Sequence, residues 1–259
     1  MTMNEELTKG CEDCVFYNAG QLKKLGVSVD NADYVVALAG NPNTGKSTVF
    51  NALTGLRQHT GNWPGKTVTR AEGGFQYNDK RFKLVDLPGT YSLLSTSEDE
   101  EVARNFILFG RPDVTVIVVD ASRLERNLNL VLQVLEITNQ AVLCLNLMDE
   151  AKRHDITIDD RTLAKDLGIP VIPTSARNRE GVNELLQTVY QVAAQEIECK
   201  PRKIKGLSPD IKRAVDDLSK KILNQYPGLP NSRWVAMRLL DGDQQVLQAL
   251  QNGEFQTVA

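Results

Sequence analysis

The octapeptide GNPNTGKS at residues 40–47 constrains the fold more than any other part of the chain. It fits the pattern Gly-x-x-x-x-Gly-Lys-Ser/Thr, and it stands between a β-rich run at 34–39 and a helix-forming run at 46–54. A chance glycine-rich turn would not have both flanking elements. In this context backbone N–H groups and the helix N-terminus surround phosphate groups. We therefore predict a phosphate loop formed by Gly40, Asn41, Asn43, Thr44, Gly45, Lys46, Ser47 and Thr48.

The rest of the chain alternates between strand and helix patterns, which predicts a P-loop fold with a doubly wound, mostly parallel sheet. The expected strands lie at 34–39, 114–120, 141–145 and 171–174, with a hairpin at 73–86 that turns at Asn-Asp. The expected helices lie at 46–54, 124–138, 160–167 and 181–196, followed by further helices in 208–226 and 232–251. The expected domains are an N-terminal extension at 1–32, an α/β domain at 33–198 and a small helical domain at 199–259.

The segment DLPGT predicts the second part of the phosphate site. Asp86 ends a strand after the phosphate loop and is expected to support Mg²⁺ together with the Ser47 hydroxyl, while Lys46 reaches the β- and γ-phosphates. Gly89 lets its backbone N–H approach a γ-phosphate. Many GTPases carry a glutamine after this glycine to orient the attacking water. Here that position is Thr90, so a nucleotide-binding module without turnover is an alternative.

The segments NLMD and TSAR predict the base. The Asp149 carboxylate can accept hydrogen bonds from the ring N–H and the amine of guanine, a donor pair that adenine lacks. Asn146 stands at the end of the same strand. Ser175 and Ala176 follow another strand end, and the Ala176 N–H is expected to face the guanine oxygen. Leu147 replaces the lysine of the usual Asn-Lys-x-Asp motif, which lowers affinity more than specificity.

Composition limits the partners. The chain has 33 acidic and 30 basic residues, a net charge of -3 and a pI near 5.6, which argues against a nucleic-acid-binding surface. Its apolar runs are too short to cross a bilayer, and the N-terminus has no secretory pattern. These features predict a soluble, cytoplasmic protein.

The four cysteines do not indicate a disulfide framework in a chain of this size. Cys144 lies in an apolar run and is expected to be a small buried residue. Cys11 and Cys14 form a single C-x-x-C, and the chain has only two histidines, so an unligated segment is favoured over a metal or redox site. His59 and His154 are expected to be solvated loop residues rather than catalytic bases.

Five segments, in the order GNPNTGKS, GNWPGKTVT, DLPGTYSL, NLMD and TSAR, resemble the cytosolic G-domain of the ferrous iron transport protein B family. The most specific pieces are RQHTGNWPGKTVTRAEG at 57–73 and DASRLERNLNLVLQVLE at 120–136. The resemblance covers residues 34–196 firmly. From about residue 200 onward the chain is similar, less specifically, to the small helical domain of the family.

The resemblance implies a GTPase that binds GTP and GDP with Mg²⁺ and turns over slowly. It implies that Thr67 closes over Mg²⁺ and the γ-phosphate in the triphosphate state. It also implies that Asn43 ligates a K⁺ ion that stabilises transition-state charge; the alternative is a hydrogen bond from Asn43 to the loop backbone. Lys46 and Gly89 complete the expected catalytic set. Trp63 and the proline after it are expected to dock in one nucleotide state and leave in the other rather than form a fixed surface turn.

The resemblance further implies that the chain is the N-terminal part of a bacterial ferrous iron transporter. This part would lie on the cytoplasmic face of the inner membrane and control Fe(II) uptake. The implied partners are a downstream permease region, absent from this chain, and small cytosolic regulator proteins, with a homo-oligomer left open and no nucleic acid. A soluble GTPase of ribosome or tRNA maturation is an alternative. It is disfavoured because residues 200–259 offer no basic RNA-binding module.

Overall fold

The structure is a computed structural model that describes residues 22–29, 32–55, 58–94, 97–203, 208–227, 229 and 231–251. Within these ranges the chain divides into two compact units, Leu22–Lys203 and the helical residues from 208 onward. Cys11 and Cys14 lie outside the described residues. None of the helices in the described ranges has the length and apolarity that a membrane span requires.

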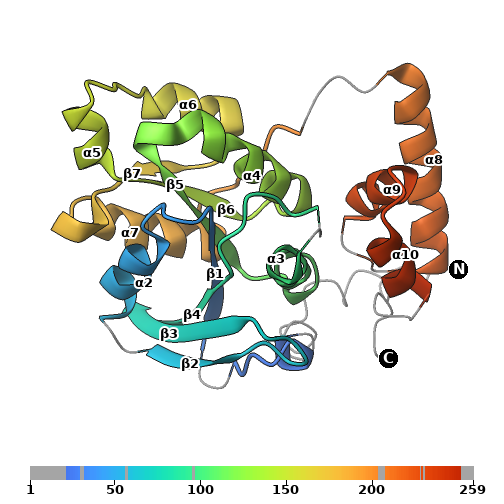
Figure 1. The fold of residues 1–259 in the computed structure, drawn as a ribbon, viewed down its shortest axis with the longest axis horizontal. Coiled ribbons are helices and arrows are strands. Elements are labelled where there is room, and N and C mark those ends of the chain that lie inside the picture. Colours follow the sequence, from blue (N-terminus) through green and yellow to red (C-terminus); the bar gives the residue numbers. More distant parts are fainter. Residues whose placement is uncertain are drawn as a thin grey trace, which may run out of the picture. The chain divides into compact units, whose positions relative to one another are not determined.

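The first unit is built on a seven-stranded sheet with the strand order β2-β3-β4-β1-β5-β6-β7 (Figure 1). The strands are β1 Tyr34–Gly40, β2 Gln58–Asn62, β3 Thr69–Tyr77, β4 Lys80–Asp86, β5 Val114–Asp120, β6 Ala141–Asn146 and β7 Val171–Pro173. β1 is parallel to β4 and β5, and β5, β6 and β7 continue in parallel, whereas β2 and β3 are antiparallel additions. The predicted mostly parallel sheet is confirmed.

Helices pack on both faces of this sheet. They are α2 Lys46–Thr54, α3 Glu98–Gly110, α4 Leu124–Ile137, α5 Met148–Arg153, α6 Asp160–Leu167 and α7 Val182–Ala193, with short 3₁₀ turns η1 Ala121–Arg123 and η2 Ala176–Asn178. One core cluster joins α2 and α7 to alternate residues of β1, β5 and β6, among them Leu38, Val118 and Cys144. Because strand side chains alternate between faces, Ile117 and Val119 point to the other face, where α4 packs on β5 and contacts α3.

The antiparallel part of the sheet differs from the sequence prediction in extent. The predicted Asn-Asp turn is present, with φ of 48° at Asn78 and 59° at Asp79, as a tight two-residue hairpin requires. However, β3 already begins at Thr69, and β2 was not predicted. The β2 sequence QHTGN has no apolar alternation, so its strand conformation depends on pairing with β3 rather than on its own propensity.

Helix α3 was also missed, although the sequence carried a signal for it. Ser97 caps the helix, with its hydroxyl accepting the Glu100 N–H at 3.3 Å. A serine followed three residues later by glutamate, ahead of an apolar periodic run, is a known start of a helix. Here the run includes Val102 and the fully buried Phe106.

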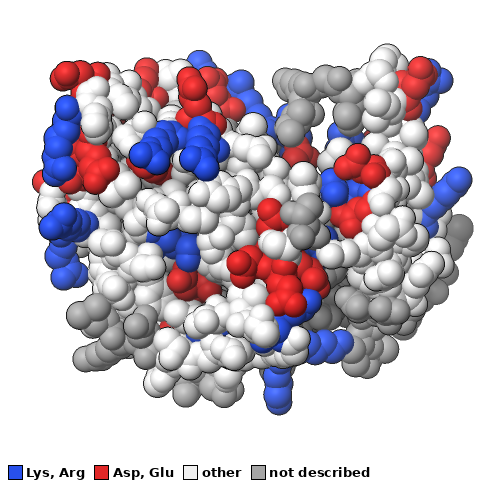
Figure 2. All heavy atoms as spheres, in the orientation of Figure 1, with Lys and Arg blue, Asp and Glu red and all other residues white. Residues whose placement is uncertain are grey.

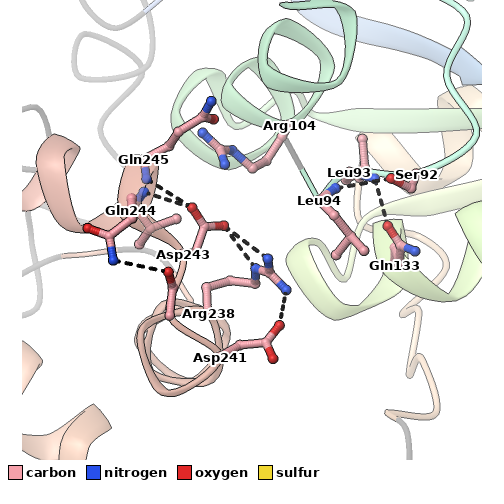
Figure 3. Close-up of polar contacts among 12 residues, drawn as sticks. Ser92, Leu93, Leu94, Arg104, Gln133, Arg238, Asp241, Asp243, Gln244 and Gln245 are labelled. Carbon is pink, nitrogen blue, oxygen red and sulfur yellow. Dashed lines mark hydrogen bonds and ion pairs between the residues drawn. The ribbon is translucent and has the colours of Figure 1, made fainter. Parts of the chain in front are cut away.

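The helical unit contains α8 Pro209–Gln225, α9 Ser232–Leu240 and α10 Gln244–Gln251. The stretch 232–251 is thus two helices with a break at Gly242, where φ is 81°. Figure 3 shows how this break is held: Arg238 bonds to Asp241 at 2.8 Å and to Asp243 at 3.1 Å. The other carboxylate oxygen of Asp243 accepts the Val246 N–H at 3.2 Å and so caps α10.

Both signs of charge occur on the face shown in Figure 2, but they are unevenly placed. Acidic side chains gather over α3, whose first turn carries Glu98, Asp99, Glu100 and Glu101. The face drawn shows no broad positive patch of the kind that nucleic-acid binding uses.

Candidate nucleotide site

The phosphate loop runs from the end of β1 to the start of α2, and its glycines are sterically required. Gly45 has φ of 79°, and a Cβ there would lie 2.4 Å from the Asn146 side-chain nitrogen. A Cβ on Gly40 would lie 2.5 Å from the Val118 carbonyl oxygen. The Thr44 hydroxyl donates to the Asn41 carbonyl at 2.9 Å and closes the loop. The loop conformation is therefore fixed by its surroundings.

Lys46 and Asp86 meet at the centre of the site. The Lys46 ammonium forms an ion pair with the Asp86 carboxylate and donates to the Leu87 carbonyl at 2.7 Å. Burial raises the pKa of Asp86 above its ordinary value, and the Lys46 charge opposes this shift. The contribution of the Leu87 carbonyl was not predicted, because backbone acceptors leave no mark in the sequence.

The segment after Asp86 crosses directly beside the phosphate loop. The Leu87 N–H donates to the Leu38 carbonyl at 3.0 Å, and the Thr90 N–H to the Gly40 carbonyl at 3.3 Å. Gly89 lies next to Pro42, whose atoms would be 3.5 Å from a Cβ on Gly89. Thr90 is only 5% exposed, so its side chain packs inside the protein.

Asn146 joins the phosphate loop to the predicted base site. Its side-chain nitrogen donates to the Thr44 carbonyl at 3.0 Å, and its side-chain oxygen accepts the Ala176 N–H at 3.1 Å. The sequence assigned this N–H to a guanine oxygen; in the structure it bonds to Asn146, so a base oxygen would share the donor. Asn146 is 1% exposed. It connects the carboxyl end of β6 to the phosphate loop and to the turn that begins at Ala176.

Asp149 lies on the first turn of α5 beside these groups. Its N–H donates to the Ser175 hydroxyl at 3.2 Å, and its half-buried carboxylate accepts from Arg153 at 3.3 Å. Leu147 has φ of 61°, and its side chain approaches Gly45. The apolar residue in the place of the usual lysine therefore lies next to the phosphate loop.

The loop with Thr67 belongs to the same edge of the sheet, but its hydroxyl is engaged elsewhere. Ala71 of β3 lies opposite Asp86 of β4, so the turn before β3 leaves the sheet at the carboxyl end of β4. Thr67 is exposed and donates to Glu98 of α3 at 3.1 Å. The printed bond of Thr67 therefore directs its hydroxyl to α3 rather than to the Lys46–Asp86 centre.

Besides Thr67, the exposed members of the predicted site are on the phosphate loop and on the first turn of α2. They are Asn43, which has φ of 65°, Ser47 and Thr48. His59, on strand β2 rather than in a loop, and His154 are both exposed. Cys144 is buried as predicted, and burial raises the pKa of its thiol to about 12. Within the described ranges no three His, Cys, Asp or Glu side chains converge as a metal site.

Comparison with known proteins assigns the family. Residues 34–189 match the model of "Ferrous iron transport protein B", and residues 208–259 match that of the "FeoB cytosolic helical domain". The chain belongs to the ferrous iron transport protein B family. The resemblance inferred from the sequence is confirmed.

Curated relatives in this family include the Fe(2+) transporter FeoB of Shigella flexneri, 42% identical over 213 residues, and that of Salmonella typhimurium, 40% identical over 213 residues. Both alignments cover 80% of this chain but 27% of the relative. The chain therefore spans about a quarter of the length of these family members.

The solved structures that the chain resembles include cytosolic domains of this family. That of L. pneumophila FeoB is 34% identical with a TM-score of 0.76, covering 85% of this chain and 87% of its own. The cytosolic domain of T. maritima FeoB in its GMPPNP form is 36% identical with a TM-score of 0.76, covering 83% and 84%. The same domain is also known in a GDP form, at 37% identity with a TM-score of 0.76, covering 83% of each chain.

The bridging role of Asn146 gives a testable expectation. Asn146→Ala should lower the free energy of unfolding by about 1–3 kcal/mol, because the Ala176 N–H and the Thr44 carbonyl lose a buried partner. Chemical denaturation measures this, with Asn183→Ala, an exposed position on α7, as the matched control. Equal stability of the two variants would contradict the bridging role.

Proposed function

We propose that the chain is the Mg²⁺-dependent, GTP-binding and GTP-hydrolysing switch domain of a bacterial ferrous iron transporter. The observation that carries this proposal is the meeting of Lys46 and Asp86 beside a sterically fixed phosphate loop. The GDP and GMPPNP forms of the T. maritima relative support a guanine nucleotide as the ligand. The proposal predicts that the purified chain converts GTP to GDP.

The residues at the phosphate loop suit both a triphosphate and its magnesium ion. We assign Gly40, Asn41, Asn43, Thr44, Gly45, Lys46, Ser47 and Thr48 to the phosphates. The Ser47 hydroxyl and the Asp86 carboxylate are hard oxygen donors of the kind that Mg²⁺ prefers, with Thr67 added in the triphosphate state. Bound Mg²⁺ would neutralise charge on the β- and γ-phosphates. Lys46 supplies positive charge at the same phosphates, and Gly89 offers its backbone N–H.

For the base we propose Asp149 as the acceptor for guanine, with Asn146, Ser175 and Ala176 shaping the pocket. The backbone N–H of Asp149 donates to the Ser175 hydroxyl, which fixes the position of the residue. Its carboxylate is half-buried, which suits a group that pairs with a base. The apolar Leu147 near Gly45 can cover the base without a charge contact.

Hydrolysis in this site needs a substitute for the missing glutamine. Thr90 is buried and short, so we propose that backbone groups of the two switch segments orient the water. The developing charge is then met by Lys46 and by a potassium ion held at Asn43, acting where an arginine acts in other GTPases. Asn43 is exposed and has its backbone at φ of 65°, directly before Thr44.

Potassium dependence follows from this assignment. We expect hydrolysis by the wild-type chain to be about tenfold or more faster in KCl than in NaCl, because removing one group that stabilises transition-state charge costs about 10²–10³ in rate. Asn43→Ala should be slow in both salts. Phosphate release at matched ionic strength measures this. Identical wild-type rates in the two salts would refute the potassium site.

Thr67 should distinguish triphosphate from diphosphate. Thr67→Ala is expected to lower turnover while it leaves GDP affinity nearly unchanged, because its proposed contacts exist only when the γ-phosphate is bound. Calorimetric titration with GDP and with a non-hydrolysable GTP analogue checks this. Equal weakening of both ligands would make Thr67 a structural residue.

The wider setting is also a proposal. We place the G-domain at 33–198, the helical domain at 199–259 and an extension at 1–32, on the cytoplasmic face of the inner membrane. Because the curated relatives are Fe(2+) transporters of which this chain spans 27%, we propose a permease region as its partner. Small cytosolic regulators and self-association remain open. The domain would control iron uptake through contacts that differ between its GTP and GDP states.

A further inference from the structure

The first turn of α3 is bonded to the turn Trp63–Val68, named here the switch turn. The Thr67 hydroxyl donates to one carboxylate oxygen of Glu98 at 3.1 Å. The Lys66 ammonium donates to Glu101 at 2.9 Å. These two acids are three residues apart on a helix and so lie on one side of it. Two neighbouring residues of the switch turn are therefore held by one helical turn.

The same helical turn also holds the segment that follows Gly89. The Ser92 hydroxyl donates to Glu100 at 2.8 Å and accepts the Leu94 N–H at 3.3 Å. The next residue, Leu93, donates its N–H to Gln133 of α4 at 2.6 Å (Figure 3). We call Glu98, Glu100 and Glu101 the clasp. These three acids bond to both segments that flank the proposed phosphate site.

The switch turn is packed against α3 in a way that suits reversible docking. Trp63 is 3% exposed, and its ring meets Phe106 edge-on at 5.5 Å between centroids. Its indole N–H is buried without a hydrogen-bond partner among the described residues. Such a donor disfavours the docked position, because in water it would be bonded.

The docked turn also leaves space beside it. An open pocket of about 130 Å³ lies beside the switch turn and α3, with Pro64, Lys66, Glu101 and Val102 in its wall. Because water can enter this pocket, α3 covers the switch turn only partly on this side, and Pro64 is exposed. The docked turn is thus held by the packing of Trp63 on Phe106 together with the polar bonds from Glu98 and Glu101.

These bonds compete with the role proposed for Thr67. Its hydroxyl donates to Glu98 here, and the acidic clasp keeps the side chain directed at α3. We propose that Glu98 is a positioning residue that holds Thr67 away from the phosphates until a triphosphate binds. Glu100 and Glu101 then couple release of the switch turn to movement of the Ser92 segment. This inference rests on the proposed function, since it requires Thr67 to serve the triphosphate state.

The test compares Glu98→Ala with Asp99→Ala in the full chain. Asp99 is the matched control: it is exposed on the same first turn of α3, and its substitution removes the same charge. Affinities for GDP and for a non-hydrolysable GTP analogue are measured by calorimetry with Mg²⁺. We expect Glu98→Ala to raise the preference for the triphosphate analogue by about three- to tenfold, the scale of one net hydrogen bond. Asp99→Ala should leave the ratio unchanged.

A double variant tests whether Glu98 acts through Thr67. In Thr67→Ala, adding Glu98→Ala should no longer change the ratio of the two affinities, because the bond between them is already gone. Independent, additive effects would overturn the proposal, as would an unchanged ratio in Glu98→Ala alone. If Glu98→Ala weakens both ligands equally, its role is structural and the proposal also fails.

Trp63 supplies a readout that does not depend on activity. The chain has two tryptophans, so a Trp234→Phe background leaves Trp63 as the reporter. The triphosphate analogue should shift Trp63 emission to longer wavelength, and Glu98→Ala should show part of that shift with GDP. Emission that is the same with both nucleotides in both variants would overturn the clasp. A wild-type chain that binds neither nucleotide would instead refute the proposed function.

Discussion

Lys46→Ala is expected to abolish GTP hydrolysis, with a loss of about 10²–10³ or more in rate. Lys46 is the positive side chain that the fold places at the phosphate loop, where it bonds to Asp86 and the Leu87 carbonyl. Without it, charge that develops on the phosphates would lose a positive hydrogen-bond donor. Phosphate release under single-turnover conditions measures the effect.

Two further variants make this result interpretable. Ser47→Ala should have a similar effect through the proposed magnesium ligand, and Ser47 is exposed, so its removal does not disturb the core. Lys165→Ala, at an exposed lysine on α6, should keep the wild-type rate. Wild-type hydrolysis in Lys46→Ala, with folding intact by circular dichroism, would remove the phosphate site from this loop.

Asp149→Asn is expected to invert base selectivity. Binding of GTP and GDP should weaken by about 1–3 kcal/mol, or about five- to 150-fold, because guanine donors lose their acceptor. Xanthine nucleotides carry a carbonyl where guanine has an amine, so they should bind the asparagine variant better than the wild type. Competition between guanosine and xanthosine diphosphates measures the change.

The ion pair of Asp149 with Arg153 provides the control. Arg153→Ala removes that partly exposed ion pair, which is expected to contribute little to the free energy of unfolding. The variant should leave base selectivity unchanged. If Asp149→Asn and Arg153→Ala behave alike, Asp149 has a local structural role and the base site lies elsewhere.

Local signals in the sequence identified several residues of the candidate site. Gly40, Gly45 and Lys46 form a motif whose spacing is set by backbone geometry, and the structure gives each a steric or electrostatic reason. Asp86 and Asn146 were placed at strand ends, and parallel pairing of β4, β1, β5 and β6 brings those ends to one edge. Both predictions depended only on the order of strands and loops.

What the sequence did not show depends on tertiary structure. No local sequence pattern predicts that the side-chain amide of Asn146 bonds to both Thr44 and Ala176. The same is true of the hydrogen bond from Thr67 to Glu98. The partner in each case is far along the chain and is chosen by the fold. Helix α3 is different: its serine cap and acidic first turn were visible in the sequence.

Single-turnover hydrolysis tests the central claim most directly. The purified chain, in excess over radiolabelled GTP with Mg²⁺ and K⁺, should form GDP and phosphate, and the reaction should stop when EDTA is added. ATP under the same conditions should remain intact, and Lys46→Ala should give only the background rate. A chain that binds GTP in the presence of Mg²⁺ yet forms GDP no faster than Lys46→Ala would be a binding module without turnover, contrary to this account.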